Sequence, residues 1–271
     1  MGVYPAYFIL IFVAFYFFLF SYSSSKYIYQ YFRKRHHYGR LKSIVNIYRN
    51  YLLLGQTLLD KVMVMSNMDN QFTYFMDWEE NLLQMENQGS GGILISAHIG
   101  NWEIAGHWFS RISQSINIVM LDAEHRQIKE YFDSILQKRS YNIIPIKDDM
   151  SHIYQIGAAF QRRELVCMHA DRFIEGNKTI KKNFLGEPAS FPLGPFIIAA
   201  TFRVPVTFVF AFKESLTHYH FYSTTPMVFG RDIPREKIIE ELMTTFVSKV
   251  EELVHKYPRQ WFNYYDFWRI S

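Results

Sequence analysis

The segment that decides the fold is Gly92-Ile93-Leu94-Ile95-Ser96-Ala97-His98-Ile99-Gly100-Asn101-Trp102-Glu103. Its apolar run Ile93–Ala97 follows a glycine-rich turn, which predicts a strand buried on both faces. His98 comes directly after this strand, and Asn101 is a suitable N-cap for a helix that starts there. The segment therefore predicts a strand, a polar turn and a helix, the unit from which parallel α/β sheets are built.

The same alternation continues along the chain. Further buried strands are predicted at Ile116–Leu121, Ile143–Ile146, Leu165–Met168 and Val204–Phe212. Helical spacing is found at Leu41–Met65, Asn101–Ile112, Ala123–Lys138, Asp149–Gln161, Phe196–Phe202 and Arg235–His255. We therefore predict an α/β fold in which a largely parallel or mixed central sheet is flanked by helices. Residues 71–271 would form this catalytic domain, and residues 1–70 an N-terminal anchor and helical region.

The first 25 residues carry no charged side chain, and Tyr7–Phe20 is entirely apolar or aromatic. A helix that crosses a bilayer needs about 20 such residues, so this stretch fits a tilted or half-inserted anchor and is marginal as a span. No basic residue precedes it, which is unlike a cleaved signal peptide. The alternative is a helix buried in the protein core.

Basic residues follow the apolar stretch. Residues 1–59 contain seven lysines and arginines and no acidic residue, although the whole chain has a net charge of only +4. This asymmetry favours the cytoplasmic face of a membrane with anionic lipids, and we expect the catalytic domain to face the cytoplasm. An aromatic and basic strip could instead bind RNA, but the adjoining apolar run favours membrane, and we expect no nucleic acid partner.

The chain has one cysteine, Cys167, so an internal disulfide and a cysteine metal cluster are excluded. Its apolar neighbours indicate a buried strand position. The histidines His107, His125, His152 and His169 lack the spacing of a zinc-binding motif such as H-E-x-x-H. We therefore expect no metal and no cofactor.

His98 and Glu103 are the candidate catalytic pair. Ligands of open α/β sheets bind at the carboxyl ends of strands, where His98 is expected. A histidine can take a proton from a hydroxyl or an amine if its other ring nitrogen is held by an acceptor, and Glu103 could be that acceptor. Backbone N–H groups at Gly100 and Asn101 could then stabilise an oxyanion, and Gly100 would leave room for the substrate. A histidine five residues before a glutamate also occurs by chance.

The stretch His98–Glu103 resembles the H-x4-D/E motif of the lysophospholipid acyltransferase superfamily, and specifically the HxGNWE form of the bacterial late acyltransferases of lipid A biosynthesis. The similarity continues at Asp171, through residues 182–189 and 192–195, and to the ending Pro258–Phe262. It implies a glycerolipid acyltransferase-like fold and transfer of an acyl chain from an acyl carrier protein or CoA thioester to a lipid-like acceptor at the bacterial inner membrane. His98 would be the base and Glu103 its partner, with no metal.

Two departures from the lipid A enzymes concern the acceptor. This chain has Asp122-Ala123-Glu124-His125 where those enzymes usually carry an arginine, and Arg172 where a glutamine is common. An acyltransferase that builds an aminolipid or an acylated pigment fits the sequence equally well. A lipid or thioester hydrolase with the same pair is a further alternative, because water can replace the acceptor. A noncatalytic membrane scaffold would have little reason to keep the pair.

Several residues are predicted to bind substrate. Asp171 and Arg172 follow the strand Leu165–Met168, so Arg172 could bind a phosphate or carboxylate, although the two could also form a surface pair. Lys178, Lys181 and Lys182 would give a cationic rim for an acidic carrier protein, or a merely solvated loop. The predicted substrate-binding set is Gly100, Asn101, Trp102, Asp171, Arg172, Lys182, Gly186 and Gly194.

Overall fold

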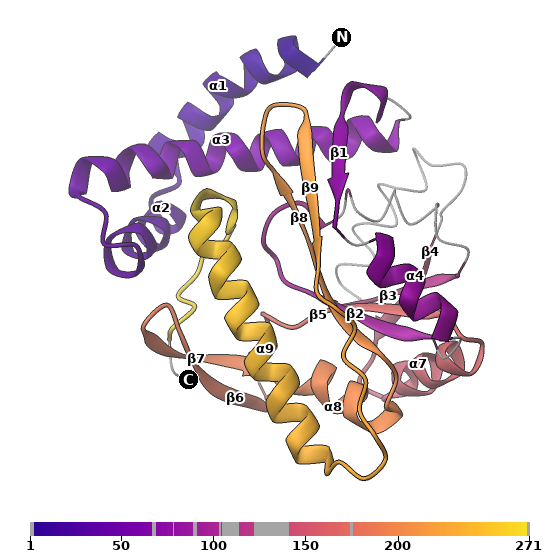
Figure 1. Cartoon of the computed structure of the whole chain (residues 1–271). Helices are drawn as coiled ribbons and strands as arrows, with labels where there is room; N and C mark the ends of the chain where they lie inside the picture. Colours follow the sequence, from indigo (N-terminus) through magenta and orange to yellow (C-terminus); the bar gives the residue numbers. More distant parts are fainter. Residues whose placement is uncertain are drawn as a thin grey trace.

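The computed structural model describes residues 3–66, 69–77, 79–88, 91–102, 104, 114–121, 141–173 and 176–269. Seven strands form one sheet in the order β1-β9-β8-β2-β5-β3-β4 (Figure 1). Neighbouring strands are parallel, except that β8 and β9 form an antiparallel hairpin. The strands are β1 (Thr73–Met76), β2 (Gly92–Ser96), β3 (Ile116–Leu121), β4 (Tyr141–Ile146), β5 (Leu165–His169), β8 (Val206–Lys213) and β9 (His218–Ser223).

The central strand β2 is buried on both faces because its alternate side chains enter two different cores. Ile93 and Ile95 join one hydrophobic cluster with residues of α7 (Ser151–Gln161), α8 (Gly194–Phe202) and α9 (Arg235–Lys256). Leu94 joins a second cluster with residues of α4 (Glu79–Gln88) and of the N-terminal helices. A strand covered on both faces needs apolar side chains throughout, which explains the run that begins at Gly92.

The N-terminal region is helical and packs against the α/β body. It consists of α1 (Val3–Phe20), α2 (Tyr22–Gln30), the π-helix η1 (Tyr31–Arg35) and the long helix α3 (Arg40–Met65). Helix α1 lies along α3 at one side of the sheet (Figure 1). Side chains of this region, including Phe32 and Ile47, are part of the first core cluster. The boundary near residue 70 that the sequence suggested stays a prediction, since both sides of it share one core.

Smaller elements complete the described fold. Strands β6 (Thr179–Phe184) and β7 (Glu187–Pro192) form a separate antiparallel hairpin. Two short 3-10 helices, η2 (Asp69–Gln71) and η4 (Pro258–Gln260), precede β1 and follow α9. The C-terminal aromatic segment packs on β6, where Trp268 Nε1 donates a hydrogen bond to the Phe184 carbonyl at 3.1 Å. Phe184 also meets Trp261 edge to face.

The predicted fold class is confirmed, and the five predicted strands are β2, β3, β4, β5 and β8, with ends shifted by up to two residues. The predictions missed β1, β6, β7 and β9, because these strands lack the continuous apolar run by which the others were recognised. The predicted helix Ala123–Lys138 lies outside the described residues, and so does Asn101–Ile112 apart from its first residues. The exposed outer face of α1 excludes the alternative of a fully buried core helix: only 17% of this helix is buried.

Candidate active site

The pairing of β2 with β5 builds the site. The two strands are parallel and in a register that sets Ser96 opposite His169. His98 lies two residues after Ser96 at the end of β2, and Asp171 lies two residues after His169 at the end of β5. Because both strands end at the same edge of the sheet, these two side chains are neighbours although 73 residues separate them in the sequence.

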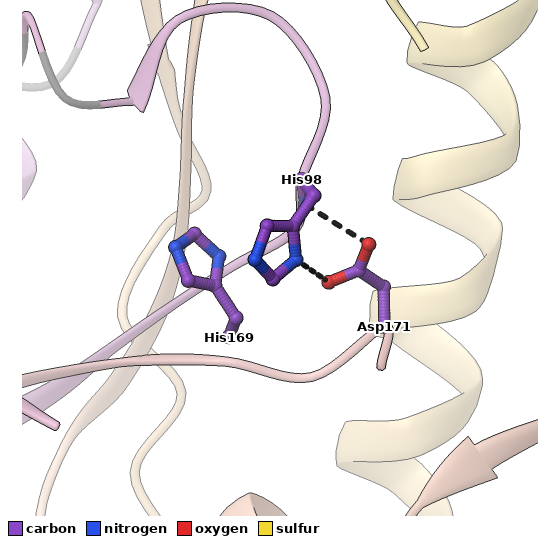
Figure 2. Close-up of side chains that lie close together, drawn as sticks. All are labelled: His98, His169 and Asp171. Atoms are coloured by element: carbon purple, nitrogen blue, oxygen red, sulfur yellow. Dashed lines mark hydrogen bonds and ion pairs between the residues drawn. The ribbon is translucent and has the colours of Figure 1, made fainter. Parts of the chain in front are cut away.

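His98 is held by Asp171 at two points. The His98 Nδ1 lies 2.8 Å from Asp171 Oδ1, and the His98 backbone N–H donates to Oδ2 at 3.0 Å (Figure 2). The Asp171 side chain is only 3% exposed, whereas that of His98 is 24% exposed. A carboxylate accepts and does not donate, so Nδ1 carries a hydrogen and Nε2 keeps its lone pair in the neutral ring. The outer nitrogen can therefore take a proton from a bound substrate.

Asp171 stays ionised despite its burial. Burial alone would raise the pKa of this carboxyl, but the attraction and hydrogen bond of His98 outweigh it and lower the pKa to about 2. His169 and Arg172 act in the same direction. A permanently charged carboxylate behind an imidazole stabilises the imidazolium that forms when the base takes a proton.

A second histidine, His169, lies against the first (Figure 2). Its ring centroid is 4.3 Å from that of His98 and 4.6 Å from that of Trp102, which it meets edge to face. Burial, assisted by the nearby His98, lowers the pKa of His169 to about 3. His169 is therefore neutral at pH 7 and brings no second positive charge to the base.

The turn after His98 differs from the prediction. The Gly100 N–H donates to the Gln260 carbonyl at 2.8 Å, and the Asn101 N–H donates to the Ala211 carbonyl at 2.7 Å. Both donors expected to stabilise an oxyanion are thus used inside the protein, and that prediction is wrong. Gly100 has a φ of +66°, and a Cβ on it would lie 1.9 Å from the Ala211 oxygen. The glycine makes room for the backbone of β8, where the prediction had placed substrate.

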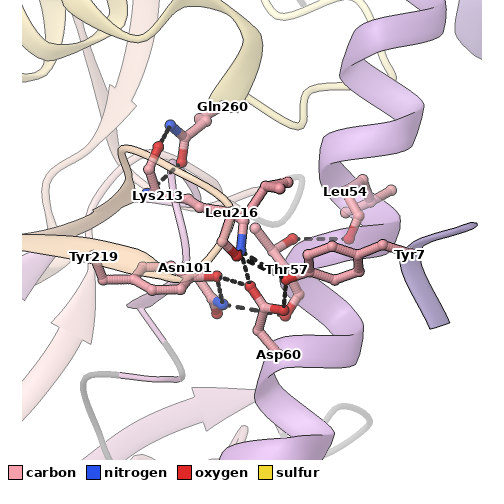
Figure 3. A network of polar contacts seen from close by, with 9 residues as sticks. All are labelled: Tyr7, Leu54, Thr57, Asp60, Asn101, Lys213, Leu216, Tyr219 and Gln260. Atoms are coloured by element: carbon pink, nitrogen blue, oxygen red, sulfur yellow. Dashed lines mark hydrogen bonds and ion pairs between the residues drawn. The ribbon is translucent and has the colours of Figure 1, made fainter. Parts of the chain in front are cut away.

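A buried polar network holds this turn to the N-terminal helices (Figure 3). The Asn101 side-chain amide, 5% exposed, donates to the Thr57 carbonyl of α3 at 3.1 Å and to the Tyr219 hydroxyl at 3.2 Å. Tyr219 in turn donates to Asp60, which forms an ion pair with Lys213. The Asn101 side chain is therefore engaged inside the fold, and its place in the substrate-binding set stays a prediction.

Asp60 and Lys213 are both almost fully buried. Tyr7 of α1 donates a hydrogen bond to Asp60, and the Lys213 ammonium donates to the Tyr7 hydroxyl at 2.8 Å and to the Leu216 carbonyl at 2.6 Å. Removing one partner of such a buried pair typically costs about 3–5 kcal/mol, because the other charge is left uncompensated. The network joins α1, α3 and the β8–β9 hairpin to the turn that carries His98.

The remaining predicted residues are placed as follows. Arg172 is exposed, donates to the Phe262 carbonyl at 3.2 Å and lies over the Tyr265 ring. Lys182 pairs with Glu240 of α9, so the structure shows an intrachain partner for its charge. Gly186 lies in the β6–β7 turn with a positive φ of 85°, and Gly194 begins α8. Glu103 lies outside the described residues, and its role stays a prediction.

From the sequence, Asp171 is predicted to bind substrate, and no role in the site is predicted for His169. The register of β2 and β5 brings both residues to His98, and the amino-acid composition of these strands does not predict that register. Three possible metal ligands lie within 4.8 Å of one another, one atom each from His98, His169 and Asp171. This spacing could hold a metal ion. The expectation of a metal-free reaction therefore stays a prediction, which activity in the presence of a chelator can check.

The chain is similar in sequence to known acyltransferases. The sequence profile of the family described as bacterial lipid A biosynthesis acyltransferase matches residues 45–269. The chain is also similar to the phosphatidylinositol mannoside acyltransferase of two Mycobacterium tuberculosis strains, each 22% identical over 112 residues. These residues cover 41% of this chain and 35% of the relatives, so the chain spans about a third of the length of the curated relatives it matches.

Replacing Gly100 by alanine should destabilise the protein by about 2–4 kcal/mol, because a Cβ there meets the Ala211 backbone at a positive φ. Urea unfolding followed by circular dichroism measures this loss. Gly39→Ala is the matched control, since no atom lies within 4 Å of its Cβ position. Equal stability of the two variants would contradict the packing of the turn against β8.

His169 should make the protein acid-sensitive. Its pKa is about 3 in the folded state against an ordinary value of 6.5, so the unfolded chain binds the extra proton and stability falls as the pH drops below about 6.5. His169→Phe should flatten that fall by up to about 1.4 kcal/mol per pH unit. Urea unfolding between about pH 6.5 and pH 4.5 tests this, above the range in which Asp171 is protonated.

The exposed residue Val228 provides the control. Val228→Ala changes no ionisable group and should leave the pH dependence as in the wild type. If His169→Phe also has the wild-type pH dependence, His169 is not buried in the neutral form.

Proposed function

Since the chain belongs to the bacterial lipid A biosynthesis acyltransferase family and is an enzyme of the acyltransferase class, we propose that it moves a fatty acyl group from a carrier thioester to a hydroxyl or amine of a lipid-like acceptor. The observation that carries this proposal is the His98–Asp171 pair at the carboxyl ends of β2 and β5. It supports general-base catalysis, since the buried carboxylate holds Nδ1 and leaves Nε2 for the acceptor.

The proposed reaction needs no covalent enzyme intermediate. His98 Nε2 takes the proton of the acceptor hydroxyl or amine while that oxygen or nitrogen attacks the thioester carbonyl carbon. The tetrahedral intermediate then collapses, the carbon–sulfur bond breaks, and the thiolate receives the proton from the imidazolium. The products are the acylated acceptor and the free carrier thiol. Asp171 remains ionised throughout and stabilises the imidazolium.

Glu103 keeps its proposed role as a partner of His98, on the strength of the HxGNWE resemblance. The geometry adds Asp171 as a carboxylate that contacts the His98 ring in the described part of the chain. Two carboxylates can serve one base in different ways, with Asp171 fixing the ring and Glu103 as a further partner of the base. Separate substitutions distinguish these roles.

An acyl carrier protein or CoA is the proposed donor. Arg172 follows Asp171 directly and is exposed, as are Lys178 and Lys181 a few residues further along. These cations support binding of a phosphate-bearing or acidic partner. The printed name of the mycobacterial relatives, phosphatidylinositol mannoside acyltransferase, supports a glycolipid among the possible acceptors.

We place the enzyme at the cytoplasmic face of the bacterial inner membrane. Helix α1 is long and apolar enough to cross a membrane, and most of it is exposed. Basic residues follow it along the chain, an arrangement that favours the cytoplasmic side. A lipid-like acceptor would then be reached without leaving the membrane surface.

Replacing His98 by alanine should lower the rate of acyl transfer by about 10²–10⁴-fold, the usual worth of a positioned general base. Asp171→Asn should lower kcat by about 10²-fold or more, because an amide can present its N–H to the ring and cannot stabilise the imidazolium. The double variant should be no slower than His98→Ala, since an orienting group has no effect without the base. Transfer from a radiolabelled acyl carrier protein to extracted membrane lipid measures each rate.

Glu103→Gln is assayed beside these variants, with His37→Asn as a control for histidine loss. Residual activity in Glu103→Gln together with a larger loss in Asp171→Asn would assign the main orienting role to Asp171. A folded His98→Ala protein with near-normal transfer would contradict the mechanism. So would an acyl group trapped on Ser96 or Cys167.

A further inference from the structure

Helix α1 contacts the rest of the protein along its whole length. It runs antiparallel to α3: Tyr7 donates to Asp60, Leu10 lies against Gly55, and Phe15 and Phe18 meet Tyr48. Gly55 lacks a side chain, and a Cβ there would lie 2.9 Å from Leu10. The absence of that side chain lets the two helices approach closely.

Polar contacts fix the first half of α1 to the α/β body. The Val3 backbone N–H donates to Gln71 Oε1 at 3.1 Å, just before β1. The Tyr7 hydroxyl donates to the Leu216 carbonyl in the β8–β9 turn at 3.1 Å and also contacts the buried pair Asp60 and Lys213. The beginning of α1 therefore touches the catalytic body itself, not a separate stalk.

The second half of α1 is fixed to α3. The Tyr48 hydroxyl of α3 donates to the Ile11 carbonyl at 3.3 Å, and Phe17 packs on Tyr51 with ring centroids 6.4 Å apart. Tyr51 also lies 3.1 Å from the Ser25 hydroxyl, at the chain segment that follows α1. Both ends of α1 are thus held against one face of the same domain (Figure 1).

The outer side of α1 is a continuous apolar face. Five of its exposed side chains share a helical spacing and are between 53% and 65% exposed: Tyr4, Phe8, Phe12, Phe15 and Leu19. Ile9, Tyr16 and Phe20 widen this apolar surface, with exposed fractions of 55%, 58% and 70%. Helix α3, which packs against α1, also has exposed apolar residues: Leu41, Ile44 and Val45. Arg40, Lys42 and Arg49 of α3 are exposed beside them. An apolar face next to cations matches the surface of a bilayer that contains anionic lipid.

Length alone would permit a crossing, because 18 helical residues span about 27 Å and the hydrocarbon core is about 30 Å thick. A perpendicular α1 would, however, take α3 with it into the bilayer, together with its charged and amide side chains. It would also carry the β8–β9 turn to one side of the membrane and Tyr51 to the other. Each of these steps would bury charged or hydrogen-bonded groups in hydrocarbon.

We infer that α1 lies in the plane of the membrane and enters one leaflet with its outer face, so that the enzyme is bound to a single lipid surface without crossing it. This inference rests on the proposed membrane association and specifies its geometry. The contacts between α1 and the Asp60 network would then set the orientation of the catalytic body relative to that surface. Anionic lipid would strengthen binding through the cations of α3.

A depth profile along α1 tests this geometry. Single cysteines replace Tyr4, Phe8, Phe12, Phe15 and Leu19 in the full-length chain, and each carries a fluorophore. The native Cys167 competes little for the label at neutral pH, because burial raises the pKa of its thiol to about 12. The labelled proteins are bound to vesicles of phosphatidylethanolamine and phosphatidylglycerol that contain a nitroxide either near the headgroup or near the acyl-chain end. Tyr154→Cys, on the exposed surface of α7, is the control, and the unsubstituted protein measures background labelling.

An in-plane helix predicts that all five positions are quenched to a similar degree, more by the headgroup nitroxide than by the deep one, with Tyr154→Cys unquenched. Vesicles without phosphatidylglycerol should bind the protein more weakly, by about fivefold for each cation that contacts the surface. A profile in which Phe12 is deepest and Tyr4 and Leu19 are shallow would show a crossing and overturn the inference, while leaving membrane association intact. Five positions no more quenched than Tyr154→Cys would overturn both. Acyl transfer in detergent, measured on the same proteins, reports separately on the proposed chemistry.

Discussion

The parallel pairing of β2 with β5 is the constraint on which the site depends. Its register sets Ser96 opposite His169. The segments that follow the two strands then lie close together, with His98 on one and Asp171 on the other. A shift of one residue would turn alternate side chains to the opposite face and separate base from carboxylate. The apolar core on both faces fixes that register, so the same burial that stabilises the fold also positions the chemistry.

A second constraint acts on the far side of His98. The turn at Gly100 and Asn101 uses its backbone N–H groups to bind β8 and the C-terminal segment, and the Asn101 amide reaches α3 and Tyr219. Asp60 and Lys213 continue these bonds to Tyr7 of α1. The base is thus held between two strands of the sheet and a buried network that begins in the N-terminal helix. The helix proposed to contact the membrane and the residues proposed for catalysis therefore belong to one connected structure.

Much of this was predictable from sequence. Apolar runs identified the buried strands, because a strand covered on both faces must be apolar throughout. The motif also drew attention to His98, which the structure pairs with Asp171. The partners of the turn were not predictable. Gly100 reads in the sequence as space for a substrate, whereas in the structure the Ala211 backbone fills that space.

The polar strands β6 and β9 and the edge strand β1 were missed for a related reason, since their pairing partners, and not their own composition, make them strands. Asp171 was singled out, but for another role. Its contact with His98 depends on a register between segments 73 residues apart, and composition and spacing do not encode that distance.

The most direct test of the central claim is the protonation of the His98 ring. Nitrogen-15 NMR of the histidine-labelled protein in detergent micelles, with the His98 signals assigned by their loss in His98→Gln, shows which ring nitrogen carries hydrogen in the neutral form. The account predicts hydrogen on Nδ1, bound to Asp171, and a bare Nε2 that is free to take a proton. A neutral ring with hydrogen on Nε2 and a bare Nδ1 would contradict the pairing with Asp171 and the base that the mechanism requires.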